Sequence, residues 1–307
     1  MPLDFTDRVA IVTGAGGGLG RQHALALAAR GAKVVVNDLG GAVDGSGGSA
    51  SAAEAVVRDI RALGGQAIAN GASVTDFAAV QQLAQQAIDT WGRIDIVVSN
   101  AGILRDKTFA KMDLADFRTV LDVHLMGAVH LCKAVWPHMM AARYGRIVLT
   151  TSSSGLYGNF GQSNYGAAKL ALVGLMQTLA LEGHKHGIHV NCLAPTAATR
   201  MTESLFAPDM LVAFKPETVG PAMLVLASEG GATRTTLCAG AGSFEAAHIT
   251  LSEGVYIGTG PDADMQLAQR LDEVIGTLDR ASVPASGAGQ GANEMRLLAA
   301  ARGARAG

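Results

Sequence analysis

The chain lacks the sequence features of membrane, secreted and nucleic-acid-binding proteins. None of its apolar runs approaches the ~20 residues that a membrane-spanning helix needs. The first residues, MPLDFTDR, contain no basic region followed by an apolar one, so no secretory signal is expected. With Lys+Arg 24 against Asp+Glu 26, the formal net charge of −2 provides no general attraction for nucleic acid. We therefore expect no membrane span and no nucleic-acid partner.

Cysteine is also scarce. The three cysteines, Cys132, Cys192 and Cys238, lie in apolar contexts and do not have the spacing of metal ligands. An odd number of cysteines in such contexts indicates reduced, buried thiols rather than a disulfide framework. We therefore expect a cytoplasmic protein without a bound metal. At 307 residues, of which 49% are hydrophobic, the chain is long enough to bury one large core.

Strand-like and helical segments alternate along the chain. Apolar runs that fit buried strands cover residues 8–13, 33–38, 66–73, 94–100, 145–153, 188–195 and 235–242, with helical patterns between them. This alternation predicts an α/β fold: a single doubly wound Rossmann domain with a parallel sheet of about seven strands and helices on both faces. We assign residues 1–280 to this domain. Residues 281–307 are rich in small residues and are expected to form a loose tail, with a short helix near residues 294–302.

A glycine-rich turn lies between the first two predicted strands. Gly14 permits a sharp turn, Gly18 lets the backbone approach a pyrophosphate, and Gly20 allows the following helix to pack closely on the sheet. Asp38 closes the second strand, where a carboxylate accepts hydrogen bonds from both ribose hydroxyls of adenosine and repels a 2′-phosphate. Because no arginine or lysine adjoins Asp38 in NDLGGAVDG, the pattern favours NAD over NADP. The alternative interpretation of Asp38 is an aspartate that only caps the following loop.

A possible catalytic pair lies further along the chain. Tyr165 and Lys169 are four residues apart and therefore share one face of a predicted helix. Because a neighbouring ammonium stabilises phenolate, we expect Lys169 to lower the pKa of Tyr165. Ser152 follows a predicted strand and is expected to hold the oxygen that Tyr165 protonates. The three residues together indicate interconversion of an alcohol and a carbonyl, whereas the Tyr165/Lys169 spacing alone also fits an ordinary exposed helix pair.

These motifs together resemble the short-chain dehydrogenase/reductase family over residues 7–242. The matching parts are TGAGGGLG, SNAG at residues 99–102, and the set Ser152, Tyr165 and Lys169. NDLGG, SNAGILRDKTF, VHLMG and YGRIVLTTSSSGLYGNFGQSNYGAAK are most similar to the (3R)-hydroxyacyl-CoA dehydrogenase domain of the multifunctional enzymes of peroxisomal β-oxidation (17β-hydroxysteroid dehydrogenase type 4), which also oxidise 17β-hydroxysteroids. The hydratase and sterol-carrier domains of those enzymes are absent from the sequence, so the resemblance implies a stand-alone, bacterial form.

The resemblance also implies a role for each matching residue. Tyr165 would be the general acid/base, Ser152 would orient the substrate oxygen, and Lys169 would bind the nicotinamide ribose and tune Tyr165. His124 stands where the wider family commonly has asparagine and close relatives have histidine, so it is either a fourth catalytic residue in a proton relay or a buried polar residue. The remaining cofactor contacts that the resemblance implies are Leu19, Ser73, Val74, Asn100, Ala101, Gly102, Pro195, Thr196 and Thr199.

We therefore predict an NAD-dependent oxidoreductase that interconverts a secondary alcohol and a ketone. The resemblance implies a lipid-like substrate, either (3R)-3-hydroxyacyl-CoA with its 3-oxoacyl-CoA product or a hydroxysteroid. One alternative is an NADPH-dependent 3-oxoacyl carrier-protein reductase, against which Asp38 argues. Another is a catalytically silent nucleotide-sensing scaffold, against which the presence of Ser152, Tyr165 and Lys169 argues.

Two further segments have open interpretations. The stretch Met201 to Phe214 is either a cover over the substrate or a plain surface helix; its apolar residues are Leu205, Phe206, Met210, Leu211 and Phe214. The family resemblance implies a homodimer or homotetramer that packs through two long helices. The apolar face of Leu172, Met176 and Leu179 fits that use, or it faces the sheet.

Overall fold

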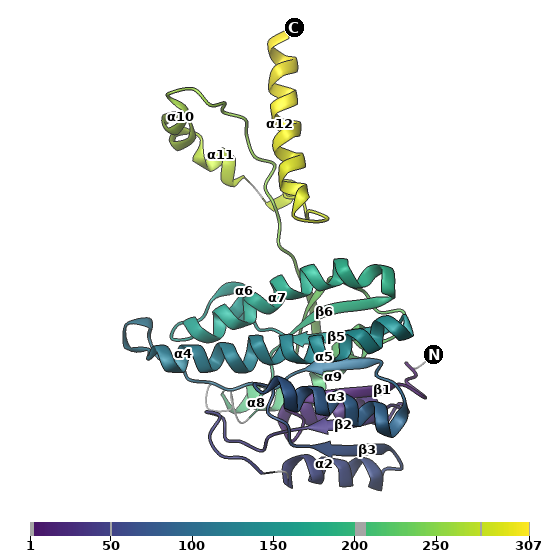
Figure 1. Cartoon of the computed structure of the whole chain (residues 1–307). Coiled ribbons are helices and arrows are strands. Elements are labelled where there is room, and N and C mark those ends of the chain that lie inside the picture. The colour runs from purple at the N-terminus through teal and green to yellow at the C-terminus, as the bar shows by residue number, and fades with distance from the viewer. Residues whose placement is uncertain (1–2, 50, 200–206, 277, 307) are drawn as a thin grey trace. The chain divides into compact units, whose positions relative to one another are not determined.

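The computed structural model describes residues 3–49, 51–199, 207–276 and 278–306 (Figure 1). The chain divides into two compact units, Met1–Ala247 and His248–Gly307. The boundary at residue 280 between the predicted domain and the predicted tail rests on amino-acid composition, and it stays a prediction. Every residue predicted for the catalytic and cofactor sites belongs to the first unit.

The described part of the first unit contains one sheet in the order β3-β2-β1-β4-β5-β6-β7-β8. Its strands are β1 Val9–Thr13, β2 Lys33–Asn37, β3 Gln66–Asn70, β4 Ile96–Ser99, β5 Gly145–Thr150, β6 Ile188–Pro195, β7 Thr236–Gly240 and β8 Ser243–Ala247. The pairings from β3 to β7 are parallel, which confirms the predicted doubly wound α/β fold. The sequence did not predict β8, which pairs antiparallel with β7 at the edge of the sheet.

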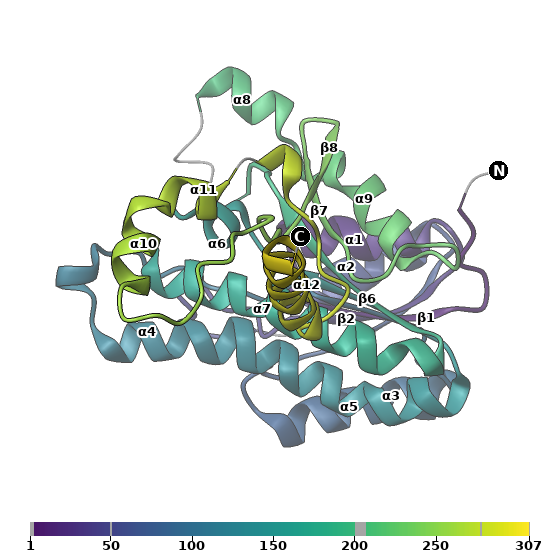
Figure 2. The same ribbon diagram turned by 90° about the horizontal axis from the view of Figure 1, so that it is seen from above.

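Helices cover both faces of the sheet. In the first unit they are α1 Gly18–Ala28, α2 Ser51–Ala62, α3 Phe77–Trp91, η1 Phe109–Lys111, α4 Leu114–Leu121, η2 Asp122–Met126, α5 Gly127–Ala142, α6 Ser153–Tyr157, α7 Ser163–Gly183, η3 His184–His186, α8 Pro208–Ala213, η5 Pro216–Val219 and α9 Gly220–Ala227. One core cluster joins α1, α2 and α9 to the sheet, and a second joins α3, α5 and α7 to the opposite face. Figure 2 shows these two helical layers on either side of the strands.

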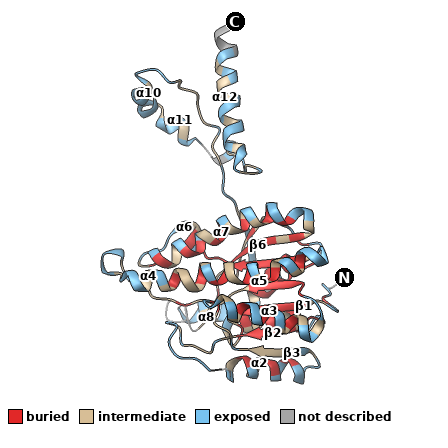
Figure 3. Cartoon of the chain, viewed as in Figure 1, coloured by how far each residue is buried: buried red, intermediate tan, exposed pale blue. Residues whose placement is uncertain are grey.

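The central strands β1, β2, β4, β5 and β6 have buried side chains on both faces, which is why they are largely apolar in sequence. Along β1, Ala10 and Val12 belong to the core beneath α1, whereas Val9 and Ile11 belong to the core beneath α3 and α5. This alternation is the two-residue period of a strand, and Figure 3 shows the resulting buried interior. Burial on both faces therefore requires apolar residues at consecutive positions, the pattern expected for a parallel sheet.

The candidate dimer face on α7 belongs instead to this core. Leu172 and Met176 are 1% and 0% exposed and pack in the cluster beneath α3 and α5. Leu179 is partly buried against the same cluster. Of the two interpretations left open by the sequence, the one in which this face meets the sheet is correct. No helix in the described ranges has the length and apolar character needed to cross a bilayer.

The second unit is mostly helical. It contains α10 Ala263–Gln269, α11 Leu271–Ile275, η6 Leu278–Arg280 and α12 Ala288–Ala306, and an isolated bridge pairs Leu251 with Ser282. The short helix predicted near residues 294–302 lies inside α12. The tail expected to be loose therefore contains a longer helix than its composition suggested.

Candidate active site

The glycine turn lies between β1 and α1. Backbone atoms pack so closely around Gly14 and Gly20 that neither position has room for a side chain. Gly14 has a φ of +63°, and a Cβ there would lie 2.7 Å from the Ala101 Cα. A Cβ on Gly20 would meet the Gly14 carbonyl oxygen. These two contacts require glycine, since any larger residue would push α1 away from the end of β1.

Thr13 and Asn100 connect the ends of β1 and β4. The Asn100 Nδ2 donates to the carbonyl oxygens of Thr13 and Gly14, each at 3.2 Å. The Thr13 hydroxyl accepts from the backbone N–H groups of Asn100 at 3.0 Å and Ala101 at 3.2 Å. Thr13 was not among the predicted site residues, although it directly precedes the glycine turn. The side chain of Asn100 thus holds the turn in place from the neighbouring strand.

Asp38 follows β2 and extends beside the same turn. Its Oδ2 accepts from the Gly16 N–H at 2.7 Å, and its Oδ1 accepts from the Gly40 N–H at 2.6 Å. The Gly40 contact means that Asp38 caps the following loop, as the alternative interpretation proposed. Each carboxylate oxygen accepts one of these N–H groups and retains capacity for a further donor.

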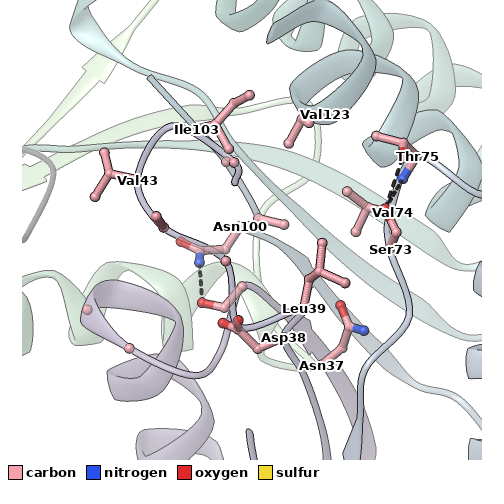
Figure 4. A pocket seen from close by; sticks show the side chains of 18 of the residues that line it. Asn37, Asp38, Leu39, Val43, Ser73, Val74, Thr75, Asn100, Ile103 and Val123 are labelled. Atoms are coloured by element: carbon pink, nitrogen blue, oxygen red, sulfur yellow. Dashed lines mark hydrogen bonds between the residues drawn. The ribbon is translucent and has the colours of Figure 1, made fainter. Parts of the chain in front are cut away.

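A pocket opens at this edge of the sheet (Figure 4). The predicted cofactor residues that line it are Gly14, Gly18, Leu19, Asp38, Ser73, Val74, Asn100, Ala101, Gly102 and Thr199. The predicted residues outside its lining are Gly20, Tyr165, Lys169, Pro195 and Thr196. Asp38 is the only charged residue among those that line it in the described structure. Residues 41–43 and 45, Ile103 and Val123 also line the pocket and were not predicted from the sequence.

α5 positions the far wall of this pocket. The His130 Nδ1 lies within hydrogen-bond distance, 2.9 Å, of the Val74 backbone carbonyl oxygen. A Cβ on Gly127 would lie 2.8 Å from the Val74 Cγ2, so the helix approaches this loop closely. Val74 and Ser73 are therefore held against the pocket by α5, as a fixed wall opposite Asp38 and the glycine turn.

The predicted catalytic residues lie together at the end of β5 and the start of α7. Lys169 is 3% exposed, and its Nζ donates to the Thr150 carbonyl at 2.6 Å. The same Nζ lies 5.4 Å from the ring centroid of Tyr165. Ser152 is the N-cap of α6, its hydroxyl accepts from the Ser154 N–H at 3.2 Å, and its interaction with Tyr165 lowers the pKa of that residue. A parallel strand end and a neighbouring helix thus bring Ser152, Tyr165 and Lys169 into one cluster.

Burial governs the pKa values of this cluster. It raises the pKa of Tyr165; the hydrogen bond with Ser152 acts in the opposite direction, and the charge of Asp106 adds to the rise. Burial also lowers the pKa of Lys169 to about 7. The sequence-based expectation of a lowered Tyr165 pKa is therefore wrong for the protein alone. Desolvation disfavours phenolate and ammonium alike, and it is the largest cause of both shifts.

His124 lies in η2, a single π-helical turn between α4 and α5. Its Nε2 is 2.8 Å from the Ile103 carbonyl oxygen and 3.1 Å from the Ile103 N, whereas its buried Nδ1 has no hydrogen-bond partner among the described residues. The ring packs edge-on against Tyr165, with centroids 5.1 Å apart. Burial and the nearby Lys169 lower the pKa of His124 well below its usual value, so the imidazole is neutral. If Nε2 donates to the Ile103 carbonyl, Nδ1 carries a lone pair and can accept a hydrogen bond; if Nε2 accepts from the Ile103 N–H, Nδ1 carries the proton and can donate one.

The remaining predicted residues lie at the end of β6. Pro195 is its last residue, and the Thr196 N–H donates to the Ala239 carbonyl at 2.8 Å. A Cβ on Gly18 would lie 3.5 Å from the Thr199 Cγ2, which places Thr199 over the glycine turn. In the proposed substrate segment, Leu205 and Phe206 lie outside the described residues. Met210 and Leu211 lie in α8, and the Phe214 N–H donates to the Met210 carbonyl at 2.8 Å.

The fold and the site described above are those of an oxidoreductase family. The chain belongs to the short chain dehydrogenase family, whose sequence model matches residues 8–209, and it is an oxidoreductase of that family. The resemblance drawn from the sequence motifs is thereby confirmed. Members of the family bind a nicotinamide dinucleotide, which the glycine turn and the pocket beside it are built to accept.

Individual relatives narrow the similarity further. A short-chain type dehydrogenase/reductase from Mycobacterium tuberculosis is 55% identical over 223 residues, which cover 73% of this chain and 78% of that protein. Mouse peroxisomal multifunctional enzyme type 2 is 53% identical over 228 residues, which cover 74% of this chain and only 31% of the mouse enzyme. Among solved structures, a 7α-hydroxysteroid dehydrogenase complexed with NADH and 7-oxo glycochenodeoxycholic acid matches with a TM-score of 0.70 and 32% identity, over 78% of this chain and 95% of that one.

Proposed function

We propose that the protein is an NAD-dependent dehydrogenase of lipid-like secondary alcohols. Its substrates would be (3R)-3-hydroxyacyl-CoAs, oxidised to 3-oxoacyl-CoAs, or hydroxysteroids. The observation that carries the proposal is that Ser152, Tyr165 and Lys169 cluster at the same edge of the sheet as the glycine turn and Asp38. The substrate class rests on the similarity to mouse multifunctional enzyme type 2 and to the hydroxysteroid dehydrogenase.

The choice of NAD over NADP rests on the charge of the pocket. Asp38 is the only charged residue among the described residues that line it, and no lysine or arginine there would balance a 2′-phosphate. The Asp38 carboxylate can accept hydrogen bonds from ribose hydroxyls in addition to its two backbone donors. A phosphate in the same place would meet a negative charge, which is unfavourable in a partly desolvated site.

The mechanism assigns one task to each residue of the cluster. When bound, NAD supplies the hydride acceptor and a positive charge, and the protein supplies placement and proton transfer. Tyr165 acts as phenolate when it takes the hydroxyl proton of the alcohol during oxidation, and as phenol when it returns that proton during reduction; the positive charge of bound NAD would favour the phenolate. Ser152 donates a hydrogen bond to the substrate oxygen as negative charge develops there, a contact whose removal typically costs ~10²–10³ in rate.

The proposed task of Lys169 and His124 is to exchange protons with Tyr165, removing one during oxidation and supplying one during reduction. A Lys169 pKa of about 7 means that its ammonium and amine forms are both populated near neutral pH. The neutral His124, whose Nδ1 has no hydrogen-bond partner among the described residues, can form a further hydrogen bond in the same buried region. We therefore propose His124 as the fourth member of the relay; the alternative is a buried polar residue without a catalytic role. Assembly as a homodimer or homotetramer is also part of the proposal.

Steady-state kinetics test the proposal. We expect turnover of 3-hydroxyacyl-CoAs or hydroxysteroids with NAD, and at least tenfold lower kcat/KM with NADP. A preference for NADPH, together with reduction of 3-oxoacyl groups on a carrier protein, would establish the biosynthetic reductase instead. Tight NAD binding without turnover of any substrate in the panel would favour the nucleotide-sensing scaffold.

A further inference from the structure

Residues 39–49, termed the strap below, form a compact loop directly after Asp38. The base of the strap is closed by a hydrogen bond from the Ser49 N–H to the Leu39 carbonyl at 2.8 Å. Within the loop, the Ala42 N–H donates to the Ser46 carbonyl at 2.8 Å. The Gly40 N–H donates to Asp38 itself, so the carboxylate that faces the pocket also anchors the strap. The strap therefore has a defined shape and is connected to the proposed ribose site.

The tip of the strap rests on the segment that follows β4. The Leu104 N–H donates to the Val43 carbonyl at 3.1 Å, and the Arg105 Nε donates to the Asp44 carbonyl at 3.0 Å. A Cβ on Gly45 would lie 3.2 Å from the Ile103 Cγ2. Figure 4 shows Val43 and Ile103 on the same side of the pocket. The strap thus spans from the end of β2 to the loop after β4.

The strap forms part of the pocket wall. Leu39, Gly41, Ala42, Val43 and Gly45 line the same pocket as the glycine turn, Asp38 and Val74. Residues 42 and 44–49 are otherwise exposed to solvent, so few apolar contacts hold the strap down. A segment that covers a ligand site and is held by a few hydrogen bonds opens at low cost in free energy.

Arg105 is the side chain that joins the strap to the body of the fold. Its Nε reaches the strap, and its Nη1 pairs with the Asp116 carboxylate of α4 at 2.8 Å. Lys107 pairs with the same carboxylate at 3.1 Å, but its backbone N–H donates to the Gly161 carbonyl rather than to the strap. The two cations therefore provide a matched pair, of which only Arg105 contacts the strap.

We infer that the strap closes over the bound dinucleotide and that Arg105 latches it, so that cofactor leaves only after the contacts with Ile103, Leu104 and Arg105 break. This inference rests on the proposed function, because it requires a dinucleotide in the pocket. The strap slows release of the reduced cofactor and keeps the cofactor site closed while substrate is exchanged at the Tyr165 end. Lid opening of this kind limits kcat in many enzymes.

A reversible crosslink tests the closed position directly. A Cβ on Gly45 would lie 3.9 Å from the Ile103 Cβ, within the ~3.5–4.5 Å range of disulfides. The double variant Gly45→Cys/Ile103→Cys is loaded with NADH, oxidised, and diluted into excess NAD while NADH fluorescence is followed. We expect release to slow by more than tenfold in the oxidised form and to recover when the same sample is reduced. The oxidised, empty form should fail to take up NADH.

Each outcome of this experiment decides between the alternatives. Equal release rates in the oxidised and reduced forms would overturn the proposal that the strap closes over the cofactor. Failure of the two cysteines to crosslink would overturn it as well. The single variants control for the native thiols, of which Cys132 and Cys192 are buried. If the wild-type protein binds no NADH, the proposed function fails. If the wild-type protein binds NADH and the double variant releases it at a rate independent of the crosslink, only the proposed role of the strap fails.

A second comparison does not depend on the crosslink or on the strained backbone of Gly45, whose φ is +89°. Arg105→Ala removes the latch, and Lys107→Ala removes the neighbouring cation that pairs with the same carboxylate. Because a single hydrogen bond is lost from the strap, we expect NADH release from Arg105→Ala to be about tenfold faster than from the wild type. Release from Lys107→Ala should be unchanged. Equal release rates in the two variants would contradict the role of Arg105.

Discussion

The polar groups at the amino ends of the strands (the amino edge of the sheet) and those at the carboxyl ends (the carboxyl edge) differ in how fully they are hydrogen-bonded. At the amino edge, the Asp95 carboxylate is 1% exposed and accepts from the Val9 N–H, from two atoms of Arg93 and from Arg8. The buried Arg146 guanidinium donates to four backbone carbonyls, including those of Ser228 and Glu229. Polar groups at this edge have partners from several elements, which is the arrangement that stabilises a buried charge.

At the carboxyl edge, some buried polar groups can form further hydrogen bonds. The buried His124 Nδ1 and Thr150 Oγ1 have no hydrogen-bond partner in the described part of the protein. The Lys169 ammonium has a pKa lowered to about 7 by burial. Buried polar atoms without partners cost stability, so the two at this edge indicate that the fold gives up stability where it holds reactive groups. The difference predicts that changes at the two edges affect different measurements.

The largest effect is expected from Tyr165→Phe at the carboxyl edge. The substitution removes one hydroxyl from the residue that transfers the proton, so we expect kcat to fall by ~10²–10⁴. The free energy of unfolding should change little, because the ring remains in place. NADH binding, followed by fluorescence titration, should survive. Turnover close to that of the wild type would remove Tyr165 from the catalytic role.

The opposite profile is expected from Asp95→Asn at the amino edge. Loss of the buried carboxylate leaves Arg8 and Arg93 without their shared anion, which should lower the free energy of unfolding by about 3 kcal/mol. Urea denaturation measures the change, and kcat of the folded protein should stay within twofold of the wild type. Asp59→Asn is the control, because it breaks an exposed ion pair with Arg21 and should cost less than about 1 kcal/mol. Equal losses in the two variants would contradict the stabilising role of the amino edge.

The third prediction concerns His23 and the dependence of the free energy of unfolding on pH. His23 is fully buried in α1, neither ring nitrogen has a hydrogen-bond partner among the described residues, and burial lowers its pKa from 6.5 to about 4. As the pH falls, the unfolded chain binds a proton at this residue before the folded protein does. Stability is therefore complete above pH 6.5 and is lost as the pH falls toward 4. Between pH 7.5 and 5 the loss from His23 is roughly 2 kcal/mol.

The variant His23→Leu isolates this contribution. It has no titratable ring, so its free energy of unfolding should fall less than that of the wild type between pH 7.5 and 5. Denaturation curves at both pH values for both proteins give the difference. Parallel losses in the wild type and the variant would mean that His23 does not titrate as its burial requires.

The smallest expected effect concerns cofactor choice. Asp38→Asn keeps an oxygen acceptor for the backbone donors but removes the negative charge from the pocket. We expect the ratio of kcat/KM for NAD to that for NADP to fall by roughly tenfold. Asp44→Asn is the matched control, since Asp44 lies in the strap but does not line the pocket. An unchanged ratio in Asp38→Asn would remove this carboxylate from the ribose site.

Local sequence patterns predicted the elements that are buried on both faces. β1 to β6 are apolar runs between turn residues, and the glycine turn has its expected place between β1 and α1. β8 was missed because its residues are largely exposed and apolar periodicity is weak there. Its hairpin depends on positive φ angles at Ala241 and Gly242, and an alanine does not indicate such a conformation in advance.

The parts of the site that depend on burial and long-range contacts could not be predicted. The direction of the Tyr165 pKa follows from desolvation, which the spacing between Tyr165 and Lys169 does not contain. The tie between Thr13 and Asn100 joins residues 87 positions apart, and the contact between Asp44 and Arg105 joins residues 61 positions apart. Tertiary contacts of this kind leave no local pattern in the sequence.

The single π-helical turn at η2 sets the angular relation between α4 and α5. It holds one residue more than an α-helical turn, and each residue of an α-helix rotates the chain by about 100°. Shortening this turn by one residue would leave both flanking helices intact in length. It would nevertheless turn the His124 imidazole away from Tyr165, or else turn the buried side of α5 away from the sheet, so the chain length at this point is itself a determinant of the active site.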